Sequence, residues 1–297
     1  MKGKLPSIGF IGAGTVATAL ARALQGKGYP VMAVASRSFS SAQKLAALVS
    51  GCVPFEDMQH AADSADILFI TTPDDAISEV AGRIEWPTGK SVVHCSGADS
   101  SGILHKAKLD GAQTGVFHPL QTFAATEQRL KGLQGTTFSL EATEPLLTHL
   151  KEMADALGGH WIVLKPEDRL PYHASAVMVS NYLVTLLKLA TDLWAGFGVT
   201  REEAIKALLP LIEGTASNID TLGLPQCLSG PISRGDSGTV EKHLRDLENH
   251  HHDILEAYRE LGLKTIPIAL EKGRIDARKA REIEAVLTTR SGEGKDL

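Results

Sequence analysis

A few polar side chains of this sequence lie where the surrounding pattern is apolar or tightly turned. In the stretch GVFHPLQTF, His118 follows the apolar residues of a strand-like run and is expected to end that strand, with Gln121 three residues further on. Histidine titrates near neutral pH, so a histidine at the end of a strand can act as a general acid or base. A histidine that only caps the strand is an equally good account, and the sequence leaves both open.

A second group lies on the apolar segment 170–195. His173 and Ser180 are seven residues apart, which puts them on nearly one face of a helix, and Asn181 lies beside that face. Polar groups on so apolar a helix are expected to be hydrogen-bonded or to face a cleft. We predict His118 or His173 as a proton donor, with Ser180 and Asn181 orienting a substrate. A histidine satisfied within the core is the alternative.

The segment SGPISRGDSGTVEKHL forms a third group. Its glycines and proline predict a defined loop, and Asp236 or Ser237 is expected to cap the helix that follows. Arg234 is a candidate to bind a substrate carboxylate or phosphate, but a salt bridge to Asp236 explains it as well. His243 is a candidate for the same cleft. The run 250–253 (HHHD) predicts no metal site, because consecutive helical side chains point about 100° apart.

The elements that must position these residues begin near the N-terminus. The stretch GFIGAGTVATAL follows an apolar strand, opens a helix and contains the spacing G-x-G-x-x-A. The first glycine permits a tight turn, the second lets the backbone approach a pyrophosphate, and the helix N-terminus attracts phosphates. A glycine-rich turn without a ligand is the alternative. The predicted contacts are Gly12, Ala13, Gly14, Thr15 and Val16.

The end of the second strand distinguishes between the dinucleotides. An NAD site places an acid there, which accepts hydrogen bonds from the ribose 2′-hydroxyl. This sequence has Ser36, Arg37 and Ser38 instead, and the next acid is Glu56. A guanidinium and two hydroxyls suit a 2′-phosphate, and the missing acid also argues against S-adenosylmethionine. We predict NADP(H); an arginine that is only solvated at the strand end is the alternative.

Two more strands end in small or hydroxyl-bearing residues. FITTPDDAI supplies Thr72, Pro73 and Asp74, and VVHCSGADSS supplies Ser96 and Gly97. The carboxyl edge of a doubly wound sheet is where ligands bind, so we expect these residues beside the nicotinamide ribose. Helix capping by Asp74 and Ser96 is an equally good account, and both roles are compatible.

The order of elements predicts the fold class. Strand-like runs alternate with helical stretches up to about residue 165, and after that the strand signals stop. We predict an α/β fold: a Rossmann-like, mostly parallel, doubly wound sheet over residues 1–165, followed by an all-helical domain over 166–297. The segment 170–195 is expected to be a helix buried on most sides. Further helices are predicted over 15–25, 41–49, 75–83, 143–157, from 200 onward, 237–261 and 276–288.

Composition limits the classes of function. The 297 residues are 43% hydrophobic and carry a net charge of −5 with no Lys/Arg-rich run, which argues against a nucleic-acid partner. The three cysteines have no metal or redox spacing. No signal peptide and no apolar run near ~20 residues are evident, so we expect a cytoplasmic protein without a membrane partner. A small-molecule substrate and a homodimer through the helical domain are expected.

Several motifs also carry a family resemblance. The glycine fingerprint with TTPDDAI, HCSGADS and FHPLQTF resembles the 6-phosphogluconate-dehydrogenase-like superfamily, to which pyrroline-carboxylate reductase, prephenate dehydrogenase and ketopantoate reductase are related. YHASAVMVSNYL and LSGPISRGDSGTVEKHL make nearly the whole chain similar to a family of NADP oxidoreductases. In that family a Rossmann-like domain is fused to an all-helical domain of unknown function. The resemblance implies this fold, NADP(H) and an oxidoreductase activity.

One departure from the better-known dehydrogenases limits what the resemblance implies. They carry Lys-x-x-x-Asn on the first helix of the second domain, whereas Val177 stands four residues before Asn181. A lysine general acid is therefore not carried over. We predict an NADP(H)-dependent oxidoreductase of a small, anionic carbonyl or imine substrate. A non-catalytic NADP-binding sensor or scaffold and a deazaflavin-linked NADP oxidoreductase are the alternatives.

Overall fold

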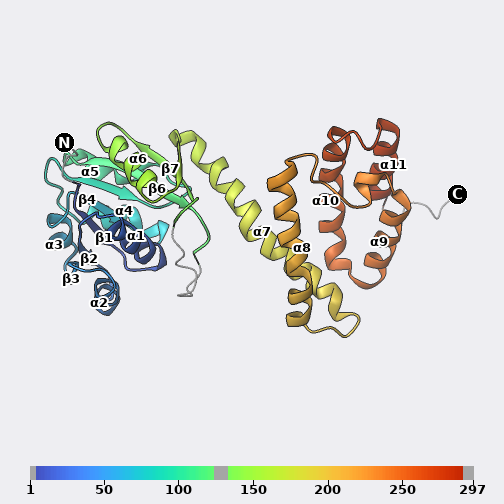
Figure 1. Cartoon of the computed structure of the whole chain (residues 1–297), viewed down its shortest axis with the longest axis horizontal. Coiled ribbons are helices and arrows are strands. Elements are labelled where there is room, and N and C mark those ends of the chain that lie inside the picture. The colour runs from blue at the N-terminus through green and yellow to red at the C-terminus, as the bar shows by residue number, and fades with distance from the viewer. Residues whose placement is uncertain (1–4, 124–132, 290–297) are drawn as a thin grey trace. The chain divides into compact units, whose positions relative to one another are not determined.

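The computed structural model describes residues 5–123 and 133–289, which divide into two compact units (Figure 1). The first unit is Met1–Asn181 and the second is Tyr182–Leu297. The division falls inside the helix Arg169–Ala195 (α7). The sequence places the boundary between the NADP-binding and the helical domain after residue 165, just before this helix, and this boundary stays a prediction.

An eight-stranded sheet forms the centre of the first unit, in the order β3-β2-β1-β4-β5-β6-β7-β8. Its neighbouring strands are parallel except β6 and β7, which are antiparallel. The order from β3 to β6 is that of dinucleotide-binding sheets. The predicted α/β class is therefore confirmed. The strands are Ile8–Ile11 (β1), Val31–Ala35 (β2), Val53–Phe55 (β3), Ile67–Ile70 (β4), Ser91–His94 (β5), Gln113–Leu120 (β6), Thr137–Ala142 (β7) and His160–Val163 (β8).

Helices cover both faces of this sheet, which is why β1, β4 and β5 are buried throughout and show no alternation of apolar and polar residues. The buried residues of α1 (Thr15–Gly26), α2 (Phe39–Ala47) and α6 (Leu146–Ala156) join one apolar core. Those of α4 (Asp74–Gly82) and α5 (His105–Leu109) join another. The short elements β3 and α3 (Met58–Asp63) were not predicted, because so few residues show no periodicity.

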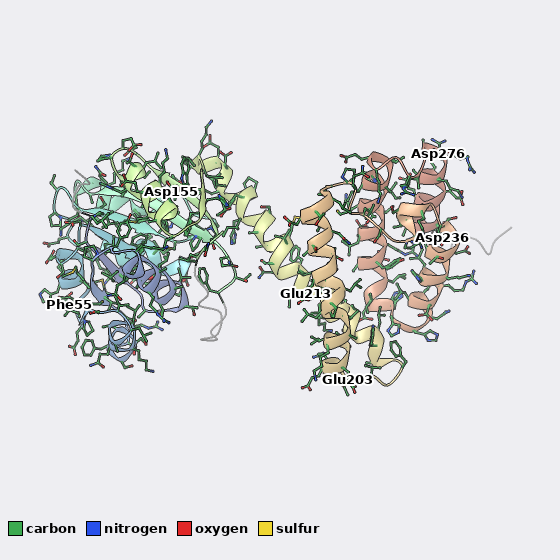
Figure 2. All side chains as sticks on the ribbon, in the orientation of Figure 1. Phe55, Asp155, Glu203, Glu213, Asp236 and Asp276 are labelled. Atoms are coloured by element: carbon green, nitrogen blue, oxygen red, sulfur yellow. The ribbon has the colours of Figure 1, made fainter. Side chains whose placement is uncertain are left out.

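The second unit has its own apolar core. Residues of α9 (Ser237–His250), α10 (His252–Glu271), α11 (Ala277–Thr288) and the 3₁₀ turn η4 (Ile232–Arg234) form it. The side chains of Asp236 and Asp276 cap α9 and α11 at the positions labelled in Figure 2. Of the two expected caps for α9, Asp236 is therefore the observed one.

One prediction for the helical unit needs correction. The helix predicted over 237–261 is two helices, because the backbone of His251 leaves the helical region, with φ −143° and ψ 53°. The apolar spacing continues across this break, which is why the sequence did not show it. The helix α8 (Arg201–Leu222) begins at a capping box of Thr200 and Glu203, at the position where the sequence predicts a helix from residue 200 onward, and Pro210 lies inside it.

The helix α7 also differs from the prediction. It is expected to be buried on most sides, yet Met178, Val179 and Val184 are 63%, 75% and 69% exposed. Among the described residues one helical segment, Pro166–Ala195, is long and apolar enough by length and composition alone to cross a bilayer. The expectation that the chain has no apolar segment near ~20 residues long is therefore wrong for this helix. The sequence pattern identified an apolar helix but not what covers it.

Candidate functional site

The loop that follows β1 has the geometry that a pyrophosphate requires. Gly12 has φ +101°, and a Cβ on it would lie 2.8 Å from the backbone of Thr71 at the end of β4. The Thr71 hydroxyl lies 3.1 Å from the carbonyl oxygens of Ile11 and Gly12, to which it can donate. A Cβ on Gly14, by contrast, would meet open space. Gly12 thus lets the two strand ends pack closely, and Gly14 leaves room for a ligand.

The start of α1 is free to bind an anion. Gly14 is its N-cap, no side chain caps the helix, and no acidic residue lies in its first turn. Gly14 and Thr15 are exposed, whereas Ala13 and Val16 pack against the apolar core. The first N–H groups of the helix are therefore not engaged by a side-chain cap, and phosphate oxygens suit them.

The end of β2 fits a 2′-phosphate. Ser36 is half-buried, and Arg37 and Ser38 are exposed. The Ser38 hydroxyl lies 2.9 Å from that of Ser40. Within the described residues Arg37 has no ion pair, so its guanidinium is free for a ligand. These residues fit the NADP(H) that the sequence predicts.

The ends of β4 and β5 are tied together by one buried serine. The Ser96 hydroxyl lies 2.9 Å from carboxylate oxygens of both Asp74 and Asp99. Since it has one hydrogen, it donates fully to one of them at a time. Asp74 follows Pro73 at the start of α4. The Thr72 hydroxyl is buried with no hydrogen-bond partner in the described part of the chain, which leaves it for a ligand.

His94, the last residue of β5, holds the loop that follows this strand by two hydrogen bonds. It was not among the residues predicted from the sequence. The Ser96 N–H donates to its Nδ1 over 3.2 Å, so Nε2 must carry the hydrogen that it donates to the Ser100 carbonyl over 3.1 Å. Burial lowers the pKa of His94 to about 4, and the charge of Arg169 acts in the same direction. His94 is therefore neutral at pH 7 and fixes the course of the loop after β5.

His118 and His173 share one site. A Cβ on the buried Gly97 would lie 2.9 Å from Nε2 of His118 and 2.7 Å from Cδ2 of His173. The two imidazole rings are 6.5 Å apart, centre to centre. Only glycine therefore fits between the loop after β5 and both histidines. The sequence left open whether the two histidines meet, and the structure brings them together with Ser96 and Gly97.

Three further residues complete this site. The Tyr172 hydroxyl is 2.9 Å from Nδ1 of His118. Arg169, whose side chain is fully buried, donates from Nε to Glu141 over 2.6 Å and from Nη1 to the Gly97 carbonyl over 3.4 Å. Sequence reasoning missed all three. The available signal was an arginine at the start of an apolar helix and a glutamate inside the strand-like run TTFSLE.

Glu141 extends the same support to the far end of the loop. Its second carboxylate oxygen accepts the N–H and the hydroxyl of Ser101, over 2.9 and 2.7 Å. The Glu141–Arg169 ion pair thus holds the loop at Gly97 and again at Ser101. Burial, the Arg169 charge and the neighbouring histidines lower the pKa of His118 to about 4.

The remaining predicted residues are not part of this cluster. Ser180 is two helical turns beyond His173, about 10 Å along the axis, and its hydroxyl lies 2.7 Å from the Ala176 carbonyl and 2.8 Å from Oδ1 of Asn181. Gln121 is exposed and accepts the N–H of Thr122 with its own side chain. The roles predicted for these three residues stay predictions.

Arg234 and His243 belong to the second unit. Arg234 ends η4 and is exposed. No ion pair joins it to Asp236 within the described residues, and Asp236 instead accepts the N–H of Thr239. Nδ1 of His243 lies 2.8 Å from the hydroxyl of Tyr258 on α10. The predicted contacts of Arg234 and His243 with a substrate stay predictions.

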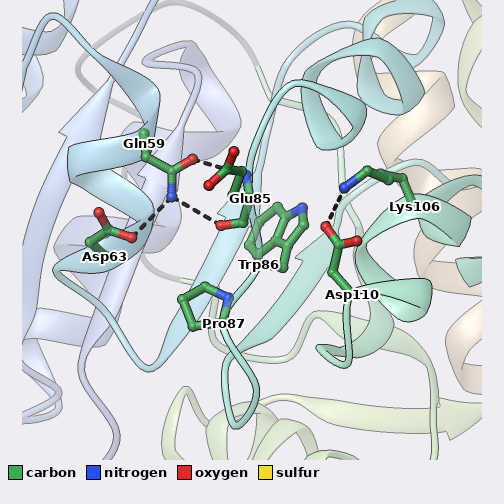
Figure 3. Close-up of a pocket in the computed structure, with 7 residues that line it drawn as sticks. All are labelled: Gln59, Asp63, Glu85, Trp86, Pro87, Lys106 and Asp110. Carbon is green, nitrogen blue, oxygen red and sulfur yellow. Dashed lines mark hydrogen bonds and ion pairs between the residues drawn. The ribbon is translucent and has the colours of Figure 1, made fainter.

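A cavity of about 620 Å³ lies at the opposite edge of the sheet (Figure 3). Its lining comes from α3, from the loop before β5, and from α5 with the residue that follows it. The polar groups in it bond to one another: Gln59 donates to Asp63 and to the Glu85 carbonyl, and Lys106 pairs with Asp110. This cavity is separate from the cofactor edge. No group of metal-ligating side chains occurs among the described residues.

Known families match both parts of the chain. Residues 7–97 match the NADP oxidoreductase coenzyme F420-dependent family, and residues 136–265 match a domain of unknown function, DUF2520. No curated protein matches the sequence.

Solved structures match nearly the whole chain. A Bacteroides fragilis protein provisionally described as an NADP oxidoreductase is 28% identical, with a TM-score of 0.71, covering 89% of this chain and 98% of its own. A Thermotoga maritima protein is 26% identical, with a TM-score of 0.70, covering 90% and 100%. The 1-pyrroline-5-carboxylate reductase of Streptococcus pyogenes is 16% identical with a TM-score of 0.60, over 91% and 99%, and this match shows the fold alone.

These matches agree with the site geometry. The glycine loop, the free helix N-terminus and Arg37 all lie within the segment matched to the NADP oxidoreductase family. Much of the helical part lies within the second matched segment. Residues 7–97 therefore correspond to an NADP oxidoreductase domain of the coenzyme F420-dependent type and residues 136–265 to a DUF2520 domain, and the cofactor is NADP(H).

Proposed function

We propose that this protein is an NADPH-dependent reductase of a small carbonyl or imine substrate. The observation that carries the proposal is a continuous row of contacts along the carboxyl edge of the sheet. It runs from Gly12 on Thr71, through Asp74 and Ser96, to Gly97 packed against His118. A bound NADPH supplies a hydride at one end of this row, where the chain itself offers hydrogen-bonding side chains.

The order of the strands supports one direction for the bound dinucleotide, with its 2′-phosphate near β2 and its nicotinamide near β4 and β5. Arg37 follows β2, the glycine loop follows β1, and the loops with Thr72 and Ser96 follow β4 and β5, which are neighbours in that order. Arg37 would hold the 2′-phosphate of NADPH and the start of α1 its pyrophosphate, which would leave the loops after β4 and β5 for the nicotinamide. The reacting carbon of a substrate would then be bound near Gly97 and His118. Arg234, as the group that binds an anionic substrate, stays a prediction.

Calorimetric titration with NADPH and NADH tests the cofactor half of the proposal. We expect Arg37→Ala to weaken NADPH binding about 10- to 100-fold and to leave NADH unchanged, since a charge-assisted hydrogen bond contributes about 1.5–3 kcal/mol. The matched control is Arg83→Ala, which removes an exposed arginine at the end of α4 that pairs only loosely with Glu79, at 3.9 Å. Equal loss for both cofactors, or no loss, contradicts the role given to Arg37.

Turnover tests the catalytic half. The wild type is incubated with NADPH and a panel of small aldehydes, ketones, 2-oxo acids and cyclic imines, and loss of NADPH absorbance is followed. A parallel series with an oxidised deazaflavin tests the alternative that the matched family name raises. Binding of NADPH without reduction of any of these compounds identifies a non-catalytic NADP sensor and contradicts a reductase.

We also propose that the chain forms a homodimer through α7 and α8. Apolar side chains on both helices are exposed, among them Val184 at 69% and Leu211 at 67%. Two ion pairs argue against α7 as a membrane-spanning helix. Arg169 in its first turn pairs with Glu141 inside the first unit, and Lys188 pairs with Asp192 in its C-terminal part, where a bilayer would have to bury both charges. A second copy of the chain covers such a surface without burying those charges in hydrocarbon.

A further inference from the structure

The hydroxyl of Tyr172 lies where the contacts of the cofactor edge end. It is 2.9 Å from Nδ1 of His118, and the two rings meet edge to face with centres 5.6 Å apart. His118 lies two residues beyond Val116, which pairs with the last residue of β5, so the pair projects past the carboxyl end of that strand. Both residues belong to the first unit. The phenol thus contacts Nδ1 of the same imidazole whose Nε2 side packs against Gly97, and both contacts form within one compact unit.

The protonation states of this pair differ at neutral pH. His118 has its pKa lowered to about 4 by burial and by three facing groups, Arg169, His173 and His94. Burial raises the pKa of Tyr172 above its usual value, against an opposing effect of Ser139 and Arg169. At pH 7 the imidazole is therefore neutral and the phenol keeps its proton. A general acid must hold a proton at the working pH, and only the phenol of this pair does.

We propose that Tyr172 is the proton donor of the reductase and that His118 is the positioning residue that holds its hydroxyl. This inference rests on the proposed function and names the acid that the function needs. From the sequence we predict His118 or His173 as the donor, and the proposal puts Tyr172 in their place. An imidazole with a pKa as low as that of His118 is almost entirely unprotonated at neutral pH.

The step balances with the groups present. As the substrate carbon accepts a hydride, the electron pair of its C=O or C=N bond moves to the oxygen or nitrogen. The phenolic O–H bond of Tyr172 breaks, a new O–H or N–H bond forms on the substrate, and Tyr172 is left as a tyrosinate. A proton from water then restores the phenol. The Arg169 charge and a hydrogen on Nδ1 of His118 favour the tyrosinate while it exists.

Tyr172→Phe tests the proposal with a substrate found in the panel above. We expect the rate of the reduction step to fall about 10²- to 10⁴-fold, which is the usual contribution of a general acid, while NADPH affinity and the unfolding midpoint stay at the wild-type values. Tyr29→Phe is the control: Tyr29 is also a buried phenol of the first unit, but it lies two residues before β2, at the opposite end of that strand from this edge. It is expected to leave the rate unchanged.

The pH profile separates the two candidate donors. A Tyr172 donor gives a rate that is level through neutral pH and falls only as the phenol ionises, above the ordinary tyrosine range. A His118 donor gives a rate that falls about tenfold for each pH unit above about 4. The second profile overturns the proposal, as does a wild-type rate in Tyr172→Phe.

A measurement that needs no substrate complements these rates. The tyrosinate absorbance of the wild type minus that of Tyr172→Phe isolates the ionisation of Tyr172. We expect His118→Phe, which has no hydrogen-bonding group at the Nδ1 position, to move this ionisation to higher pH. An unmoved ionisation contradicts the hydrogen bond on which the proposal stands. If NADPH binds and nothing in the panel is reduced, the proposed function fails and this proposal falls with it. Reduction by the wild type with an intact rate in Tyr172→Phe overturns this proposal alone.

Discussion

At the scale of single residues, two buried histidines make the stability of the first unit depend on pH. His94 and His118 each have a pKa of about 4 in the folded chain, against about 6.5 in the unfolded chain. The folded state therefore resists protonation. Its full stability is present above pH ~6.5 and is lost as the pH falls toward 4, by about 3 kcal/mol for His94, since one unit of pKa corresponds to ~1.4 kcal/mol.

Urea unfolding of wild type and His94→Gln over this pH range measures the effect. The free energy of unfolding of the wild type is expected to fall more steeply with decreasing pH than that of the variant. The difference between the two curves is expected to change by about 3 kcal/mol between pH 7 and pH 4, because carboxylates common to both proteins titrate equally in each. Parallel curves across the whole range show that His94 is not held neutral by the fold.

The buried ion pair of Arg169 and Glu141 is the second residue-scale feature with a measurable consequence. Arg169→Met leaves the carboxylate of Glu141, which is 8% exposed, without its cation. Such a removal costs about 3–5 kcal/mol of unfolding free energy, whereas replacing both partners costs less. We expect Arg169→Met/Glu141→Leu to be more stable than Arg169→Met at pH 7. A double variant as unstable as the sum of the two single ones shows that the two charges do not act as a pair.

At the scale of elements, the start of α8 depends on one hydroxyl. Thr200 Oγ1 accepts the N–H of Glu203, and the Glu203 carboxylate accepts the N–H of Thr200. We expect Thr200→Ala to lower the free energy of unfolding by about 1 kcal/mol, the usual effect of losing an N-cap. Thr200→Ser keeps the hydroxyl and is expected to retain most of the stability. Equal losses in both variants indicate that the methyl group, not the cap, matters there.

At the scale of the whole molecule, the exposed apolar surface of α7 predicts association. Light scattering coupled to gel filtration is expected to give the mass of a dimer for the wild type and that of a monomer for Val179→Asp/Val184→Asp. Leu109→Asp is the control, because Leu109 is 70% exposed on α5 and lies off this surface. A monomeric wild type, or a dimer that persists in the double variant, contradicts the proposed interface.

The sequence by itself determined the α/β class with most strands of the sheet, the glycine loop and the choice of NADP(H). These features depend on local rules: strand and helix periodicity, the freedom of glycine at Gly12, and the residue type that follows β2 at Arg37. Motifs that lie within a few residues of one another carry such information completely. The matches to known families agree with all three.

Only the tertiary structure decided which polar groups meet. His118 and Tyr172 are 54 residues apart, and Arg169 and Gly97 are 72 apart, so no local pattern could pair them. The same holds for the pKa values, since desolvation and neighbouring charges act through space rather than along the chain. The predicted burial of α7 was wrong for the same reason. An apolar sequence indicates that the surface of the helix favours contact with other apolar groups, but the residues that provide this contact are not part of the helix.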